Sequence, residues 1–253
     1  MLRVYWQPGC TSCLRAREFL RAHDIPFESL NVRDSAAARA ELTVLGVRTV
    51  PVVARGGDYV LAQDLDELAR FVGVVTERVR LSPDELAARL QALLAASETY
   101  LALMPPDRTH QRLPQRERSW LDLGFHVSMI VQALLSAGAG GQLAYEFYEM
   151  RAPGTWTSAA PAVQFCRATR AGLSYWWARA RAQPDVLLDT YWGERPLADV
   201  LERTAWHVAQ HCRQLEHLVR DVAGVQSAPA LPAAMLAGLP LPGAVWDPEV
   251  VPP

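Results

Sequence analysis

Apolar and polar residues alternate in short segments over the first 75 residues of the chain. Runs rich in β-branched and aromatic residues predict four strands, at residues 2–6, 27–32, 51–55 and 59–62. Apolar residues at helical spacing predict three helices, at residues 11–23, 35–45 and 64–72. Gly56-Gly57-Asp58, between the last two strands, is typical of a hairpin turn. This order predicts a small α/β domain over residues 1–75, in which helices cover one sheet.

The pattern changes to long helices after residue 82. Ser82-Pro83-Asp84-Glu85 combines a capping serine, a first-turn proline and a capping-box acid. Helical periodicity then predicts four helices, at residues 82–104, 119–137, 160–182 and 196–223. These helices predict an all-α bundle over residues 82–223. Seven prolines after Gly224 predict an extended tail over residues 224–253, and we expect this tail to pack on the bundle.

Composition excludes several classes of function. All 25 basic residues are arginines, so Schiff-base, pyridoxal-phosphate and P-loop mechanisms, which need a lysine, are excluded. The formal charge of −2 leaves no broad basic field for nucleic acid or an anionic membrane. We find no run of about 18 apolar residues and no secretory segment, so we expect no membrane span and a cytoplasmic location.

Two cysteines three residues apart are the first candidate for chemistry. Cys10 and Cys13 fall at the start of the first predicted helix. Amides at a helix N-terminus stabilise a thiolate, so Cys10 is the expected nucleophile and Cys13 the resolving thiol. Half of a zinc site is the alternative, but no second Cys-x-x-Cys follows, and the strand-loop-helix context favours redox work.

Three segments in order resemble the glutaredoxin family. Val4-Tyr5-Trp6-Gln7-Pro8-Gly9-Cys10-Thr11-Ser12-Cys13 is similar to the opening of a glutaredoxin. Thr49-Val50-Pro51 resembles the cis-proline loop of that family, and Ala62-Gln63-Asp64 stands where its thiol-binding loop precedes the last helix. The resemblance therefore implies a thioredoxin-like sandwich for the N-terminal domain.

The same resemblance implies how a substrate would bind. Pro51 would be cis, and the backbone beside it would pair with the cysteinyl group of a substrate. The thiol-binding residues that it implies are Thr49, Val50, Pro51 and Asp64. Thr11-Ser12 replaces the usual proline-aromatic pair, and the glycine pair common before the last helix's aspartate is absent. The partner is therefore open between glutathione, another small thiol and a protein disulfide.

Three histidines on two predicted helices are the second candidate for chemistry. His207 and His211 are four residues apart on the last helix, so their rings project from one face. Two imidazoles at this spacing form a common half of a metal site, and His126 on the second helix is placed to supply a third ligand. The alternative is that these are core histidines satisfied by hydrogen bonds.

The segments around these histidines resemble the DinB/YfiT-like superfamily. They are Ser119-Trp120-Leu121-Asp122-Leu123-Gly124-Phe125-His126 and Glu202-Arg203-Thr204-Ala205-Trp206-His207-Val208-Ala209-Gln210-His211-Cys212-Arg213-Gln214-Leu215. The resemblance implies a DinB-like four-helix bundle with a divalent metal (zinc, nickel or iron) bound by His126, His207 and His211. Members include small-thiol S-transferases, a thiol-dependent isomerase and the bundle domain of sulfoxide synthases. DinB-like bundles frequently dimerise, so the resemblance also allows a homodimer.

Other residues carry weaker expectations. Arg151 and Arg195 are candidate clamps for the carboxylate of a thiol cofactor, with a solvated surface role as the alternative. Cys166 and Cys212 are interpreted as buried small hydrophobic residues.

The fusion of the two domains indicates a thiol-chemistry enzyme, a thiol-disulfide oxidoreductase and metal-dependent thiol S-transferase. The bundle would activate a low-molecular-weight thiol for transfer, and Cys10 and Cys13 would reduce or resolve the mixed disulfide. Two alternatives stay open. One is an oxidoreductase whose bundle is a docking module with a structural metal, and the other is a metal-dependent hydrolase whose redox domain senses oxidation.

Overall fold

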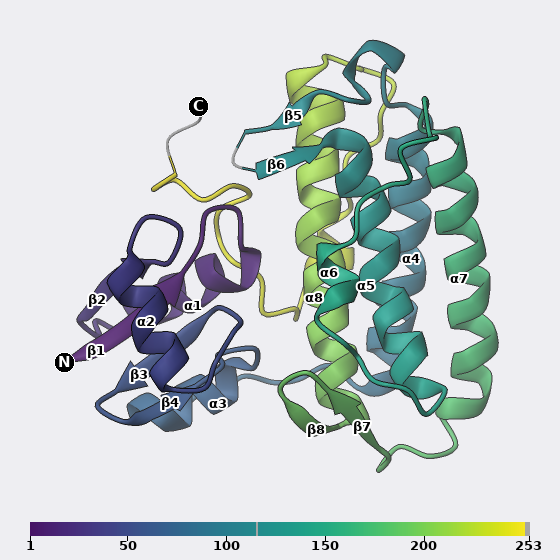
Figure 1. Cartoon of the computed structure of the whole chain (residues 1–253). Coiled ribbons are helices and arrows are strands. Elements are labelled where there is room, and N and C mark those ends of the chain that lie inside the picture. Colours follow the sequence, from purple (N-terminus) through teal and green to yellow (C-terminus); the bar gives the residue numbers. More distant parts are fainter. Residues whose placement is uncertain (115, 251–253) are drawn as a thin grey trace. The chain divides into compact units, whose positions relative to one another are not determined.

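The computed structural model describes residues 1–114 and 116–250. These residues form two compact units (Figure 1). The N-terminal unit contains Met1–Val79 and the end of the chain from Pro242, and the second unit contains Arg80–Leu241.

The N-terminal unit is built on one mixed sheet. Its strands are β1 (Leu2–Trp6), β2 (Phe27–Asn31), β3 (Val52–Arg55) and β4 (Asp58–Val60). They are ordered β2-β1-β3-β4, with β1 parallel to β2 and the other neighbouring pairs antiparallel. The helices of this unit are α1 (Thr11–Ala22), α2 (Ala36–Val44) and α3 (Leu65–Val72). All seven elements confirm the sequence prediction to within a few residues.

Both faces of this sheet are buried in its central part, because consecutive apolar residues of β1 and β3 project to opposite faces. Val4 and Val53 belong to one hydrophobic cluster, with residues of α1 and α3. Tyr5 follows Val4 in β1, and Val52 precedes Val53 in β3. Both Tyr5 and Val52 belong to the other cluster, with residues of α2. Side chains alternate between the faces of a strand, so this pairing places α1 and α3 on one face and α2 on the other.

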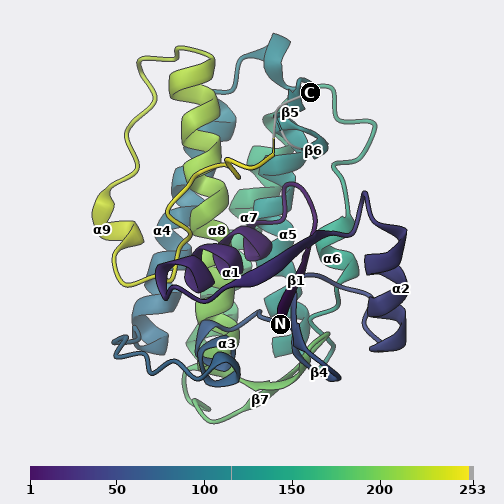
Figure 2. The ribbon, with the colours of Figure 1, turned by 90° about the vertical axis from the view of Figure 1, so that its left-hand side faces the viewer.

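The second unit is a four-helix bundle. Its long helices are α4 (Pro83–Ala102), α5 (Trp120–Gly138), α7 (Ala160–Ala180) and α8 (Leu197–Glu216). Both α4 and α5 pack against α7 and α8, so the four surround one core (Figures 1 and 2). Ser82 and Glu85 form the predicted capping box of α4, and Ser119 forms another with Asp122 at the start of α5.

Short elements lie between and beyond the long helices, and only the last of those named next, which continues α8, falls within a predicted helix, at residues 196–223. They are the hairpin of β5 (Arg112–Leu113) and β6 (Arg116–Ser119), the hairpin of β7 (Leu187–Thr190) and β8 (Gly193–Pro196), the helices α6 (Glu146–Glu149) and α9 (Ala233–Leu236), the 3₁₀ turn η1 (Pro106–Arg108), and the π-helical turn η2 (His217–Val222) that continues α8. The strand β6 ends at Ser119 and α5 begins at the next residue, Trp120, so the hairpin leads directly into this helix.

Helix α5 is long and apolar enough to cross a membrane by length and composition, with a mean hydropathy of 1.3. It is the one described helix that passes this test, which the search for apolar runs in the sequence did not anticipate. Of the window tested, 72% is buried inside the structure, as expected for the core helix of a bundle.

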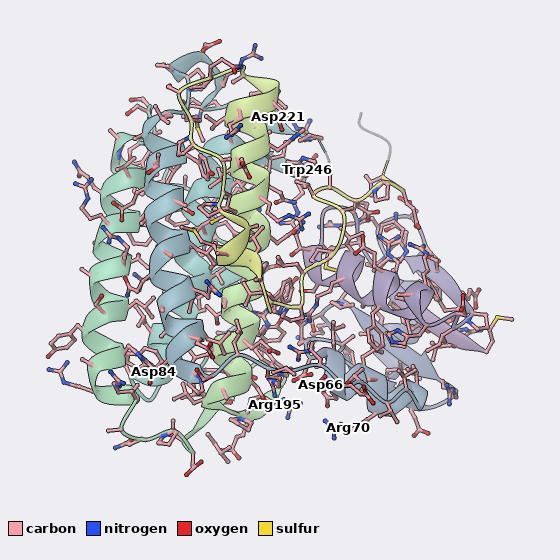
Figure 3. All side chains as sticks on the ribbon, turned by 180° about the vertical axis from the view of Figure 1, so that it is seen from behind. Asp66, Arg70, Asp84, Arg195, Asp221 and Trp246 are labelled. Atoms are coloured by element: carbon pink, nitrogen blue, oxygen red, sulfur yellow. A yellow bond between two sulfur atoms is a disulfide. The ribbon has the colours of Figure 1, made fainter. Side chains whose placement is uncertain are left out.

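The C-terminal tail is divided between the two units. Residues 224–241 belong to the bundle unit, where the Tyr100 hydroxyl donates to the Pro229 carbonyl. Residues 242–250 belong to the N-terminal unit instead, so the expectation that the whole tail packs on the bundle was wrong for this part. Trp246 is labelled on this last segment in Figure 3. Proline content predicts an extended chain, but it does not specify the surface that receives it.

The last segment of the tail is held by α1. The backbone amides of Gly243 and Ala244 donate to the Glu18 carboxylate over 2.6 and 3.2 Å. Arg17, which is fully buried, forms ion pairs with Asp247 and Glu249.

Candidate functional site

Cys10 and Cys13 stand at the N-terminus of α1 and form a disulfide with a Cα–Cα distance of 5.2 Å. Cys10 is the N-cap residue, and its Sγ accepts a hydrogen bond from the Cys13 amide over 3.2 Å. Cys10 is partly exposed, whereas Cys13 is fully buried. A thiolate released at Cys10 would therefore face solvent and keep an amide donor, as the nucleophile of such a pair requires.

The Thr49-Val50-Pro51 loop contains a cis peptide bond between Val50 and Pro51, as the glutaredoxin resemblance implied. Val50 belongs to the same hydrophobic cluster as Cys13, and Cys10 packs against that cluster. The structure thus brings this loop and the disulfide together on one side of the sheet.

The loop of Ala62, Gln63 and Asp64 precedes α3, and its last residue caps that helix. Ala62 has φ +45°, in the left-handed region that favours glycine, although the family's glycine pair is absent here. The Gln63 carbonyl accepts a 2.8 Å hydrogen bond from the buried Arg15. The Asp64 carboxylate accepts from the amides of Asp66 and Glu67, so its observed contacts are those of a helix cap.

His126 of α5 and His207 and His211 of α8 come together inside the bundle. Their potential ligand nitrogens all lie within 4.8 Å of one another, and all three side chains are buried. Ring centroids are 4.9 Å apart between His126 and His211 and 5.6 Å apart between His126 and His207. The predicted triad is therefore assembled, with one residue from the second long helix and two from the fourth.

Burial keeps the imidazoles of His126 and His211 neutral. Desolvation lowers the pKa of His211 to about 3, and the positive charges of Arg116 and Arg118 act in the same direction. Desolvation also lowers the pKa of His126 well below its ordinary value. Neutral imidazole has one nitrogen with a free lone pair, which is the form that binds a metal.

The hydrogen bond of His211 fixes which nitrogen carries that lone pair. Its Nδ1 lies 2.7 Å from Oε1 of Gln214, an oxygen that can only accept, so Nδ1 is the donor and Nε2 the free base. Within the described residues, His211 Nε2 and His126 Nδ1 are buried without a hydrogen-bond partner. Buried ring nitrogens oriented in this way fit a metal site better than they fit a satisfied core.

Comparison with known proteins bears on the first of these two sites. Residues 2–60 match the glutaredoxin family. The N-terminal domain is glutaredoxin-like. The Cys10–Cys13 pair therefore stands on a thioredoxin-like fold of the glutaredoxin type.

Individual relatives are similar over short lengths. An uncharacterized glutaredoxin-like 8.6 kDa protein in the rubredoxin operon of Clostridium pasteurianum is 27% identical over 73 residues, which is 28% of this chain and 97% of that protein. The global transcriptional regulator Spx of Enterococcus faecalis is 39% identical over 49 residues, and Spx of Streptococcus mutans is 40% identical over 42 residues. The chain spans only 37% and 31% of those two regulators.

A crystal structure of a mutant thioredoxin-like protein is 29% identical, with a TM-score of 0.28, and the match covers 28% of this chain and 99% of that protein. The family match ends at residue 60, so the character of the bundle depends on its own residues.

Two arginines that the sequence analysis did not single out, Arg116 and Arg118, act electrostatically on His126 and His211. Arg118 of β6 donates from Nη2 to the backbone carbonyl of Tyr148. The Tyr148 ring lies 6.0 Å from the His126 ring and 5.6 Å from the His207 ring, between centroids. Arg118 also lines a cleft of about 550 Å³, together with Arg151. No sequence pattern marks an arginine on a short polar strand such as β6, so only the folded chain reveals this position.

The two predicted anion clamps have different positions. Arg151 is exposed and lines the cleft with Arg118. Arg195 lies on β8 just before α8 (Figure 3), and twelve residues separate it from His207. Ten of these steps, from Leu197 to His207, are helical and span about 15 Å at 1.5 Å per residue, so Arg195 is not part of the cluster.

Cys166 and Cys212 are fully buried, as the sequence analysis predicted. Cys212 Sγ lies 2.9 Å from Ser97 Oγ, and Cys166 contacts the Leu94 carbonyl. Desolvation raises the pKa of each thiol to about 12, so both stay protonated at neutral pH. These contacts indicate structural thiols.

Proposed function

We propose that this chain is a thiol-chemistry enzyme in which the glutaredoxin-like domain exchanges disulfides and the bundle binds a divalent metal that activates a small thiol. The observation that carries the second half is the buried cluster of His126, His207 and His211. The resemblance of residues 82–223 to DinB-like bundles supports the same interpretation. A dithiol pair of this kind functions in a reducing compartment, which favours the cytoplasm.

The redox step uses Cys10 and Cys13 in turn. The reduced Cys10 thiolate attacks one sulfur of a substrate disulfide, forms a mixed disulfide and releases the other sulfur as a thiol after protonation by solvent. Cys13 then loses its proton and attacks Cys10 Sγ, which releases the second thiol and forms the observed Cys10–Cys13 disulfide. Two electrons pass to the substrate, and an external thiol donor restores the pair. The Val50 and Thr49 backbone beside Pro51 is the proposed dock for the substrate sulfur.

The metal centre is proposed for zinc, nickel or iron. Three neutral imidazoles leave open positions at such an ion, as catalytic sites do. His126, His207 and His211 would hold the ion, and the chemistry supplied by a divalent metal there would be to favour the thiolate form of a small thiol at neutral pH. Gln214 holds the His211 ring in its ligand orientation through Nδ1. In the overall transfer, the S–H bond of the small thiol breaks, a C–S bond forms at an electrophilic carbon, and the leaving group departs with the proton.

Two measurements test the two halves separately. Elemental analysis should find about one divalent metal per chain in protein purified without chelator, and His126→Ala should lose it while the exposed control His217→Ala keeps it. Cys10→Ser should abolish reduction of a small disulfide, and Cys13→Ser should accumulate a mixed disulfide at Cys10 that mass spectrometry detects.

The transfer itself is tested by the metal-free protein. If chelator-treated protein or His126→Ala transferred a mass-tagged small thiol at the wild-type rate, metal activation would be wrong. If disulfide reduction alone persisted in that protein, the oxidoreductase with a structural metal would be the correct interpretation.

A further inference from the structure

We propose that Arg116 and Arg118 form an anion site beside the histidine cluster, which selects small thiols that carry a carboxylate. This inference depends on the proposed function, because it assumes that the thiol sulfur binds at His126, His207 and His211. It specifies the class of thiol that the site accepts.

The two arginines point to one side of a strand that leads into the metal-bearing helix. Arg116 and Arg118 are two residues apart on β6, so their side chains project from the same face. Helix α5 begins at Trp120, immediately after this strand, and His126 follows in its second turn. The Arg118 guanidinium donates to the carbonyl of Tyr148, whose ring contacts the His126 and His207 rings. Arg118 is therefore one side chain away from the histidines.

Neither guanidinium is neutralised within the part of the chain that the structure describes. Arg118 Nη1 is buried without a hydrogen-bond partner, and neither arginine forms an ion pair among the described residues. The acid between them in sequence, Glu117, is exposed and pairs with Arg112. Two acids, Asp122 and Glu149, act on Arg118 without forming an ion pair with it among the described residues, and the Asp122 oxygens accept from Ser119 and from the Ala152 amide.

The electrostatic consequence is a concentration of uncompensated positive charge. Desolvation and the neighbouring Arg118 lower the pKa of Arg116 to about 9. Desolvation, followed by the charge of Arg151, also lowers the pKa of Arg118 against the opposing effect of Asp122. Arginine pairs without counter-ions are unfavourable when partly buried, and a bound anion removes that penalty. A ligand carboxylate fits because the planar guanidinium fork binds two carboxylate oxygens at once.

Placing a sulfur at the histidines and an anion at the arginines defines a short bifunctional ligand. Arg118 reaches the cluster through a single residue, Tyr148, so a thiol and a carboxylate on one small molecule suit the two subsites. The absence of lysine from the chain makes an arginine the expected cationic partner.

Thiol binding to cobalt-substituted full-length protein tests this inference without measuring turnover. Mercaptoacetate and 2-mercaptoethanol are titrated against the cobalt(II) protein at neutral pH, and the sulfur-to-cobalt charge-transfer band reports binding. The wild type should bind mercaptoacetate about 10-fold more tightly than 2-mercaptoethanol, since a charge-assisted hydrogen bond distinguishes them. Arg118→Gln and Arg116→Gln should each reduce this ratio toward one. Arg112→Gln, on the same hairpin but paired with Glu117, should leave it unchanged.

The possible failures are distinguishable. A wild-type ratio near one, or a ratio unchanged in both Arg118→Gln and Arg116→Gln, would overturn the anion site while leaving thiol binding at the metal intact. If neither thiol produced the band in a cobalt-loaded wild-type protein, the proposed function would be wrong and the selectivity with it.

Discussion

Arg17 shows how a single buried charge depends on residues at the other end of the chain. Its guanidinium lies 4.0 Å from the centroid of the Trp6 ring and pairs with Asp247 and Glu249. Arg17 is fully buried and Asp247 nearly so, so the pair is shielded from water. Removing one member of such a pair leaves a charge without its partner, which destabilises a protein more than loss of an exposed pair.

Asp247→Asn should therefore lower the free energy of unfolding of the N-terminal unit by about 2 kcal/mol. This loss is smaller than that expected on breaking a buried ion pair with no second acid, because Glu249 still contacts Arg17. Urea unfolding of the full chain, followed by hydrogen exchange in peptides from β1 and β3, measures this change. Glu28→Gln, which removes the exposed partner of Arg3, is the matched control and should have little effect. Equal stability of the Asp247→Asn and wild-type proteins would contradict the assigned contact.

Thiol reactivity should separate the four cysteines into two classes. After reduction, Cys10 should react rapidly with iodoacetamide at about pH 8, because it is partly exposed at a helix N-terminus. Cys166 should stay unlabelled in the folded protein, because burial raises its pKa to about 12 and the neutral thiol is unreactive. Peptide mass mapping before and after denaturation measures the labelling of Cys10 and of Cys166. If Cys166 in the native protein were labelled at the rate of Cys10, the bundle core would be open to the reagent.

At the residue scale, spacing along the chain indicated the cysteine and histidine positions, because each set follows a helical or turn period. Charge compensation could not be predicted in the same way. The partners of Arg17 lie 230 and 232 residues away in sequence, so no local pattern relates them. The same reason explains why Arg116 and Arg118 were not singled out.

At the element scale, α8 supplies two potential metal ligands, His207 and His211. It also supplies Gln214, the residue that orients His211. Gln214 follows His211 by three residues, so the helix itself places its Oε1 at the His211 Nδ1. Outer partners of this kind typically change metal affinity by about 10- to 100-fold. Gln214→Ala should weaken zinc binding by about 10-fold in a competition titration with a chromophoric chelator. Gln132→Ala removes a glutamine that binds Thr169 instead, and should leave the affinity unchanged; an equal loss in both variants would refute the orienting role.

The packing of α5 against α4 depends on a glycine. A Cβ at Gly124 would lie 2.2 Å from Cδ2 of Leu101, a side chain that is fully buried. Gly124→Ala should therefore lose about 1–2 kcal/mol of stability, although alanine has the higher helix propensity.

Gly172 on α7 provides the opposite case. A Cβ there would make an ordinary 3.5 Å contact with Leu135. Gly172→Ala should gain up to about 1 kcal/mol through its helix propensity. Urea unfolding followed by circular dichroism compares the two variants, and a gain in both would mean that α4 and α5 are not in close contact.

The sequence predicted long elements better than short ones. Periodicity is repeated over several turns in α4, α5, α7 and α8, and capping residues mark the starts of α4 and α5. The hairpin strands β5 and β6 contain mostly arginine and other polar residues, so they show no alternation.

At the scale of the whole molecule, the two units meet between Val79 and Arg80, in the segment that the sequence analysis left between residues 75 and 82. Arg78 pairs with Asp66 in the N-terminal unit, whereas Arg80 pairs with Asp199 and Glu202 in the bundle unit. Two arginines that are separated by one residue thus pair within different units. The sequence predicted two domains in succession, but the return of residues 242–250 to the first unit depends on contacts that proline content does not encode.

That return makes the N-terminal unit discontinuous in sequence, with the bundle as an insertion within it. A protease cut between residues 73 and 79 should therefore nick the protein without releasing a fragment, because Asp247, Glu249 and Gly243 still bind α1. Gel filtration should recover both pieces in one peak, which separates only under denaturing conditions or when a second cut is made near residue 241. Rearrangements of the gene meet the same constraint. A circular permutant that joins residue 250 to residue 1 and opens the chain within the bundle would make the N-terminal unit continuous in sequence. Expression of residues 1–79 alone would omit the C-terminal segment from Pro242, which belongs to this unit.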